Sequence, residues 1–140
     1  MFCPHFYSEI HFDIQKGNFS FLRTNIQAAK SNEFNLRCIF WTPLEFAKFK
    51  LNIAKTFNKS AIDSASKIYF LVRDYTLFHA ISDGNLIKVR NIINHHFEEL
   101  DLNTTLTVDQ ISVSLFALAK MRKEGTSSNG WEIYSLLADF

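Results

Sequence analysis

A six-residue motif, called the repeated phrase below, recurs along this chain at a nearly constant interval, and it limits the possible folds more than any other feature. Thr42–Ala47 is followed 33 residues later by Tyr75–Ala80, and weaker copies occupy Ser8–Asp13 and Ser114–Ala119. Self-similarity at this period is typical of helical repeat arrays, in which each unit buries one face against the next. The spacing therefore predicts a stack of helix pairs, an architecture that commonly holds a partner.

Helical signals accompany the repeated phrase. Thr42 followed by Pro43 has the pattern of a helix cap and a first-turn proline. The pairs Gly17-Asn18 and Gly84-Asn85 each open an apolar segment and lie 67 residues apart, about twice the period. Apolar stripes with helical spacing mark the segments themselves: Phe19–Ala29, Leu44–Ala54, Ile62–Val72, Leu86–Ile93 and Trp131–Leu137.

Strand signals are sparse. The best window is Leu36–Trp41, a short segment that can form an extended β-finger, and Leu100–Leu106 is a more polar second candidate. Ser60 and Asp109 are predicted helix starts, and Gly125–Gly130 is a loop by composition. The chain is thus predicted to be all-α, with about eight helices in four antiparallel pairs.

Composition places the chain among globular proteins and excludes several classes. It has 140 residues, of which 47% are apolar and 21% charged, with a net charge of +1 and 15 Phe. Phe needs no hydrogen-bond partner, so these rings suit a bulky core between helices. Scattered, balanced charges argue against nucleic acid. No apolar run reaches the roughly 20 residues of a membrane-spanning helix, and no secretory signal or disulfide pattern is apparent.

The phrases resemble ankyrin repeats in degenerate form. That family opens each unit with Thr-Pro-Leu-His-x-Ala, and Thr42–Ala47 keeps five of the six residue types, with Glu45 in place of His. The third unit adds Gly84 at the turn between helices and Asp101-Leu102-Asn103 where the family closes with Asp-Val-Asn. The resemblance implies a helical repeat solenoid of about four helix pairs with short or missing β-fingers.

The implied units form a single repeat domain and cover approximately residues 5–35, 36–73, 74–106 and 107–140. Some features depart from the family pattern. The second unit has no Gly in its turn, and only Arg73 and Asp74 separate its second helix from Tyr75, which leaves no room for a finger. The third unit carries an insertion around His96–Leu100.

The resemblance also implies a partner-binding face, because ankyrin partners usually contact the finger tips and the exposed ends of the first helices. Carried over position by position, that face consists of Gln15, Lys16, Trp41, Phe49, Lys50, Asp74, Ser82, Asp83, Met121 and Arg122. Aromatic, Met and charged residues together are typical of interface hot spots. Trp41 can equally pack under its own finger with Phe40, and Phe49 can be buried in an elongated helix.

Catalytic and metal-binding patterns are weak. His79 lies on a helix face beside Ala80 and is expected to be packed, and His95-His96 lies at a helix end, where His favours the negative dipole. Cys3, His5 and His11 offer no fourth zinc ligand at a fixed spacing. No phosphate loop, nucleophile elbow or His-Glu-x-x-His motif is present. We expect no metal, no cofactor and no enzyme activity.

The sequence therefore predicts a protein–protein interaction module that presents a concave helical surface to a protein partner, without membrane insertion. A cytoplasmic location is expected, and the Phe-, Ile-, Lys- and Asn-rich composition resembles ankyrin effectors that intracellular bacteria deliver into host cells. The alternatives are a self-associating domain or a segment of a longer array, since the chain ends in apolar Leu136–Phe140, and an enzyme on an irregular helical scaffold.

Overall fold

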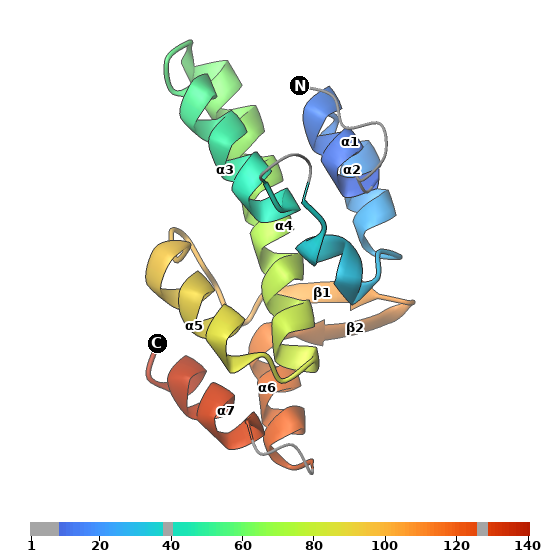
Figure 1. Ribbon diagram of the computed structural model, residues 1–140, viewed down its shortest axis with the longest axis vertical. Coiled ribbons are helices and arrows are strands. Elements are labelled where there is room, and N and C mark those ends of the chain that lie inside the picture. The colour runs from blue at the N-terminus through green and yellow to red at the C-terminus, as the bar shows by residue number, and fades with distance from the viewer. Residues whose placement is uncertain (1–8, 38–40, 126–128) are drawn as a thin grey trace. The chain divides into compact units, whose positions relative to one another are not determined.

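The computed structural model describes residues 9–37, 41–125 and 129–140, and it divides into two compact units, Met1–Val72 and Arg73–Phe140 (Figure 1). Over these residues the protein is mostly helical, with seven α-helices, one 3-10 helix and one sheet of two strands. The predicted helical class is confirmed, and the small sheet is an addition to it. None of the described helices combines the length and apolar character needed to cross a bilayer.

The first unit is built from short helices around a continuous apolar core. In chain order its elements are α1 (Glu9–Lys16), α2 (Phe19–Ile26), the 3-10 helix η1 (Ser31–Asn35), α3 (Pro43–Ala54) and the first part of α4 (Lys59–Ser82). Helix α1 packs against both α2 and α3, and η1 packs against α3. The core consists mainly of Ile10, Ile14, Leu22, Ile26, Phe34, Leu44, Phe46, Ala47 and Leu51.

The second unit combines helices with a hairpin. It contains the rest of α4, then α5 (Leu86–His95), β1 (Thr105–Val108), β2 (Ile111–Ser114), α6 (Leu115–Lys123) and α7 (Gly130–Ala138). Helix α7 lies against α6, as Figure 1 shows, and it also contacts α5. The core consists mainly of Tyr75, Leu77, Ile81, Val89, Ile92, Leu115, Ala119, Ile133 and Leu137.

The two Gly-Asn pairs form the same helix–turn–helix device, as the sequence predicts. Gly17 and Gly84 have φ angles of 71° and 70°, a left-handed conformation that glycine adopts without a Cβ penalty. The Asn that follows each glycine caps the next helix, because its side chain accepts the backbone N–H three residues on, at 3.0 and 3.1 Å. One local sequence thus turns the chain from α1 into α2 and from α4 into α5.

The predicted cap of α3 is also confirmed. The Thr42 hydroxyl accepts the Glu45 N–H at 3.3 Å, the Glu45 carboxylate accepts the Thr42 N–H at 2.9 Å, and Pro43 occupies the first turn. Glu45 therefore completes a capping box at the position where the family pattern has His. Ser114 caps α6 in the simpler way, by accepting the Ala117 N–H at 3.1 Å.

The predicted helix boundary at Arg73 and Asp74 is wrong, because both residues lie inside α4. The sequence pattern predicts that these residues separate two helices, but α4 runs unbroken from Lys59 to Ser82. This segment contains neither Gly nor Pro, and Thr76 stands where the better copy of the phrase has Pro43, so every backbone N–H can continue the helix. The Tyr75–Ala80 copy therefore lies inside a helix instead of opening one.

The strand predictions had mixed outcomes. Residues 38–40 of the Leu36–Trp41 window lie outside the described residues, whereas the Leu100–Leu106 window overlaps the start of β1. Strands β1 and β2 are antiparallel and are closed by Asp109 and Gln110, with φ angles of 51° and 69°. The prediction of a helix start at Asp109 is wrong, because this residue forms the left-handed hairpin turn that Asp tolerates.

Candidate partner-binding groove

The first unit contains an apolar groove where the end of α1, the length of α3 and the first part of α4 meet. Its volume is about 230 Å³. The buried side chains of Ile14, Ala47, Ala54 and Ile68 contribute to its wall. The described residues that line it include Lys50 and Ser64 but no Asp, Glu, His or Cys. The groove is thus equipped to contact apolar groups, with one amine available for a charge.

Small side chains leave this space open. Ala47 and Ala54 lie seven residues apart on one face of α3, Ala61 and Ala65 lie four apart on one face of α4, and Gly17 ends α1 without a side chain. Larger residues at these positions would project into the hollow. Because protein interiors are normally close-packed, a hollow bordered by small residues on two helices and in the turn after α1 is a specific feature of this sequence.

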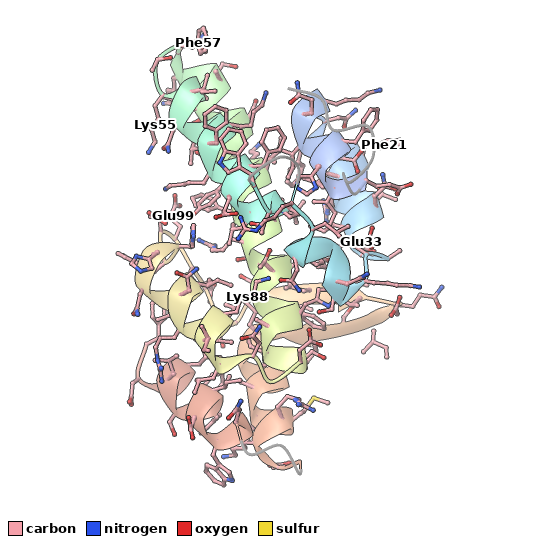
Figure 2. All side chains as sticks on the ribbon, in the orientation of Figure 1. Phe21, Glu33, Lys55, Phe57, Lys88 and Glu99 are labelled. Carbon is pink, nitrogen blue, oxygen red and sulfur yellow. The ribbon has the colours of Figure 1, made fainter. Side chains whose placement is uncertain are left out.

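Exposed apolar side chains stand at the border of the groove. Phe57, in the turn between α3 and α4, is 71% exposed, and Ile53 on α3 is also exposed. Figure 2 shows Phe57 at the tip of this helix pair, with Lys55 nearby beside α3. Scattered apolar residues are ordinary on protein surfaces, whereas exposed apolar residues that border an apolar hollow make this surface a candidate contact site.

An aromatic stack extends along α3 from this border. The Trp41 ring stacks on Phe49, with 4.2 Å between ring centroids, and on the buried Phe46 at 5.9 Å. Phe49 precedes Ile53 by one helical turn and is 37% exposed, so the predicted alternative of a buried Phe49 is not what the structure shows. Trp41 is half-buried. Both rings therefore keep a surface that a partner can contact.

Buried His11 fixes the backbone beneath this stack. Its Nε2–H donates to the Trp41 carbonyl oxygen at 2.9 Å. Burial lowers the pKa of His11 below its ordinary value of 6.5, and the hydrogen bond to Trp41 opposes this change only in part. Neutral His11 therefore joins α1 to the residue that leads into α3.

Of the ten residues predicted to bind a partner, five lie in the first unit. Gln15 and Lys16 are exposed at the end of α1, directly before Gly17, and Lys50 lies in the groove wall. Trp41 and Phe49 form the stack described above. The structure brings Lys50 to the groove and pairs the two aromatic residues, whereas their binding role stays a prediction.

The other five predicted residues lie in the second unit. Ser82 ends α4 and Asp83 follows it, before the Gly84 turn. Met121 is exposed on the last turn of α6, and Arg122 beside it is half-buried. The sequence predicts that Asp74 directly precedes a helix. This prediction is wrong, because Asp74 lies in the middle of α4.

Asp74 belongs to a buried ion pair that the sequence pattern does not predict. Arg73 is 1% exposed, and its Nη2 lies 2.9 Å from the Asp74 carboxylate. Burial raises the pKa of Asp74, while the positive charge of Arg73 opposes the increase. The Arg73 guanidinium also donates to the carbonyl oxygens of His96 and Glu98, at the end of α5. This cluster joins α4 to the segment that follows α5, which makes Asp74 a poor contact residue.

The candidate metal and catalytic residues are dispersed. His79 is buried in α4 with its ring 5.4 Å from Phe78, so it is packed as expected, and His95-His96 ends α5. Cys3 and His5 lie outside the described residues. Within the described ranges, no group of three or more His, Cys, Asp or Glu side chains is arranged to hold a metal ion.

Sequence reasoning missed the groove because its defining residues are small. The alanines at spacings of seven and four were visible as helix-packing residues, but which helices they face is decided only in three dimensions. Phe57 offered a better signal, as a large ring in the turn that precedes the Asn58 cap of α4.

Comparison with protein-family models, curated proteins and solved structures finds no match for this chain.

Proposed function

We propose that this protein is a protein-binding module that holds apolar side chains of a partner in the groove of its first unit. The observation that carries the proposal is a 230 Å³ apolar hollow with exposed Ile53 and Phe57 beside it. Removing such apolar surface from water is favourable, because water gains freedom when the hollow is filled by another apolar surface.

The size of the groove favours side-chain anchors over a free small molecule. Pockets for drug-sized ligands usually measure about 300–1,000 Å³ and carry several polar groups that orient the ligand. This groove is smaller, and Lys50 and Ser64 are the polar residues in its described wall. Anchoring a few apolar side chains from a helix is a common mode of recognition for a groove of this kind.

The Trp41–Phe49 stack supplies a second contact area beside the groove. Trp and other large aromatic residues often dominate binding energy, because one rigid ring buries much area at a small entropic cost. The stacked geometry and the His11 hydrogen bond hold Trp41 in place before a partner arrives. Such preorganisation reduces the entropy that binding would otherwise cost.

An ankyrin-like repeat scaffold remains part of this proposal. The identical Gly-Asn turns and the caps at Thr42 and Ser114 support it, because they occur at the positions that the family pattern implies. The unbroken helix α4 counts against a regular repeat at the third unit. The proposed binding function rests on the groove and does not depend on the scaffold's family.

Self-association is a second candidate, favoured by exposed apolar residues near the chain end. Trp131 on α7 and Phe140 are more than half exposed. Light scattering over a wide concentration range tests this role directly. A protein that stays monomeric throughout would rule it out.

The proposed function is tested by filling the groove. Ala65→Trp places a large ring at its α4 wall, and Ala28→Trp puts the same ring on an exposed turn of the same unit. Each protein is used to capture partners from cell lysate, and bound proteins are identified by mass spectrometry. We expect one set of partners to be retained by the native chain and by Ala28→Trp and lost with Ala65→Trp.

A second variant separates blocking from misfolding. Ile53→Asp adds a charge at the border, where the native side chain is already exposed, and circular dichroism checks the fold of every variant. Loss of the same partners with Ile53→Asp supports the groove. Recovery of identical proteins by all four chains would rule out the groove as the binding site.

A further inference from the structure

Charge in the first unit is strongly one-sided. Residues 1–72 contain nine Lys and Arg against five Asp and Glu, whereas residues 73–140 contain six against nine. The net charge of +1 for the whole chain therefore hides a positive first unit and a negative second one. The groove lies in the positive unit, so its surroundings favour a negatively charged partner.

Several acidic groups of the first unit are already engaged within the protein. The Glu45 carboxylate closes the cap of α3 and lies 3.1 Å from the Arg37 guanidinium. Buried Asp13 accepts the side-chain N–H of Asn25 at 3.0 Å. Glu33 accepts the Lys30 N–H at 2.7 Å, at the start of η1. These carboxylates serve local structure, so they contribute less to balancing the positive charge of the basic residues in this unit.

One lysine lies in the groove wall, and three more are close in the sequence to residues that line it. Lys50 forms part of the wall, Lys16 directly precedes the wall residue Gly17, and Lys55 and Lys59 flank Phe57 in the sequence. Between Pro43 and Ile68 the sequence has five Lys against two acids, Glu45 and Asp63. An apolar hollow with this border matches a ligand that has an apolar face and negative charges beside it.

We infer that the groove takes an acidic amphipathic helix of a partner protein. Its apolar residues, at spacings of three and four, fill the hollow and cover Ile53 and Phe57. Its Asp and Glu residues meet Lys50 in the wall and the lysines that flank Phe57 in the sequence. The inference rests on the proposed function and adds the chemistry of the partner to it.

The test uses three synthetic helical peptides with one shared apolar face of Leu. Their polar faces carry Glu, Gln or Lys, and binding to the intact chain is measured by fluorescence anisotropy. We expect the Glu peptide to bind roughly tenfold more tightly than the Lys peptide, with the Gln peptide between them. The difference is expected to shrink at high salt, because ions screen exposed charges.

Two substitutions assign the effect to the groove. Lys50→Glu is expected to weaken the Glu peptide several-fold and to strengthen the Lys peptide, whereas Lys120→Glu, an identical change in the second unit, alters neither. Ala65→Trp is expected to weaken all three peptides while circular dichroism stays unchanged.

Each contrary result has a distinct meaning. Equal binding of the three peptides, still lost with Ala65→Trp, would overturn the acidic partner and leave the groove as a binding site. The acidic-helix inference would also be overturned if no peptide bound, or if Ala65→Trp left peptide binding unchanged. The capture experiment then tests the proposed function separately. Concentration-dependent dimers in sedimentation that Ala65→Trp abolishes would identify a second copy of this chain as the occupant instead.

Discussion

The Tyr75 hydroxyl is bonded to both backbone groups of Thr107. It donates to the Thr107 carbonyl oxygen at 2.9 Å and accepts the Thr107 N–H at 3.3 Å. One side chain of α4 therefore satisfies the backbone of β1 at a point where β2 offers no partner. An open strand edge invites pairing with other chains, and this contact closes part of that edge.

Tyr75→Phe is expected to destabilise the protein by about 1 kcal/mol, because it removes both hydrogen bonds and keeps the ring. The midpoint of thermal unfolding should fall by about 4 °C. Tyr134→Phe is the matched control, since it removes a hydroxyl from α7 without touching Thr107. Equal midpoints for Tyr75→Phe and the native chain would show that the hairpin does not depend on this contact.

Arg73→Met is expected to destabilise the protein by about 3 kcal/mol, because it leaves the Asp74 carboxylate largely buried without its cation. Arg73→Lys should recover only part of the loss, since an ammonium cannot reproduce the forked contacts to Asp74, His96 and Glu98. Urea unfolding measures both changes.

The exposed Arg90 of α5 provides the control for Arg73. Arg90→Met should change the free energy of unfolding by less than about 0.5 kcal/mol. The double variant Arg73→Met, Asp74→Asn should lose less stability than the two single variants together, because no buried charge then stands alone. Simple additivity would argue against a coupled pair.

The pH dependence of stability is expected to report His11. Its pKa in the folded protein lies below 6.5, so the unfolded chain binds the proton more readily. The stability contribution is therefore complete above pH 6.5 and is lost as the pH falls towards the folded pKa. Urea unfolding at a series of pH values should show this decline, and His11→Asn should reduce it, whereas His95→Asn in the second unit should preserve it.

Two glycines are expected to respond differently to the same substitution. At Gly17 a Cβ would meet nothing within 4 Å, so Gly17→Ala should cost only about 1 kcal/mol for its positive φ. At Gly130 a Cβ would lie 2.5 Å from the Arg122 carbonyl oxygen, so Gly130→Ala should cost about 2 kcal/mol or more, because α7 must move away from α6. Urea unfolding of both variants makes the comparison, and equal losses would contradict it.

The local features of this fold were predictable from the sequence because short segments determine them. Thr42 with Glu45 defines a helix start, and each Gly-Asn pair defines a turn, whatever packs around them. The class of mostly helical protein follows from the apolar spacing in the same way.

Features that depend on several segments were not predictable. The resemblance of Tyr75–Ala80 to Thr42–Ala47 suggested a helix start, but without a proline or a cap the segment simply continues α4. The groove depends on which faces of α1, α3 and α4 meet, and Lys50 was placed among the contact residues by family position instead of by any view of the hollow. Neither the continuation of α4 nor the position of the groove can be predicted from a single short segment of the sequence.

Helix α4 has a practical consequence for dividing this protein. Its 24 residues cross the boundary at Val72 and Arg73, so a fragment that stops at Val72 ends inside a helix. The last four carbonyl groups of that fragment would lose their intrahelical donors. A shortened or chimeric version should therefore be joined at the Gly84 turn, where the chain already leaves the helix, so that the wall of the groove keeps a complete α4.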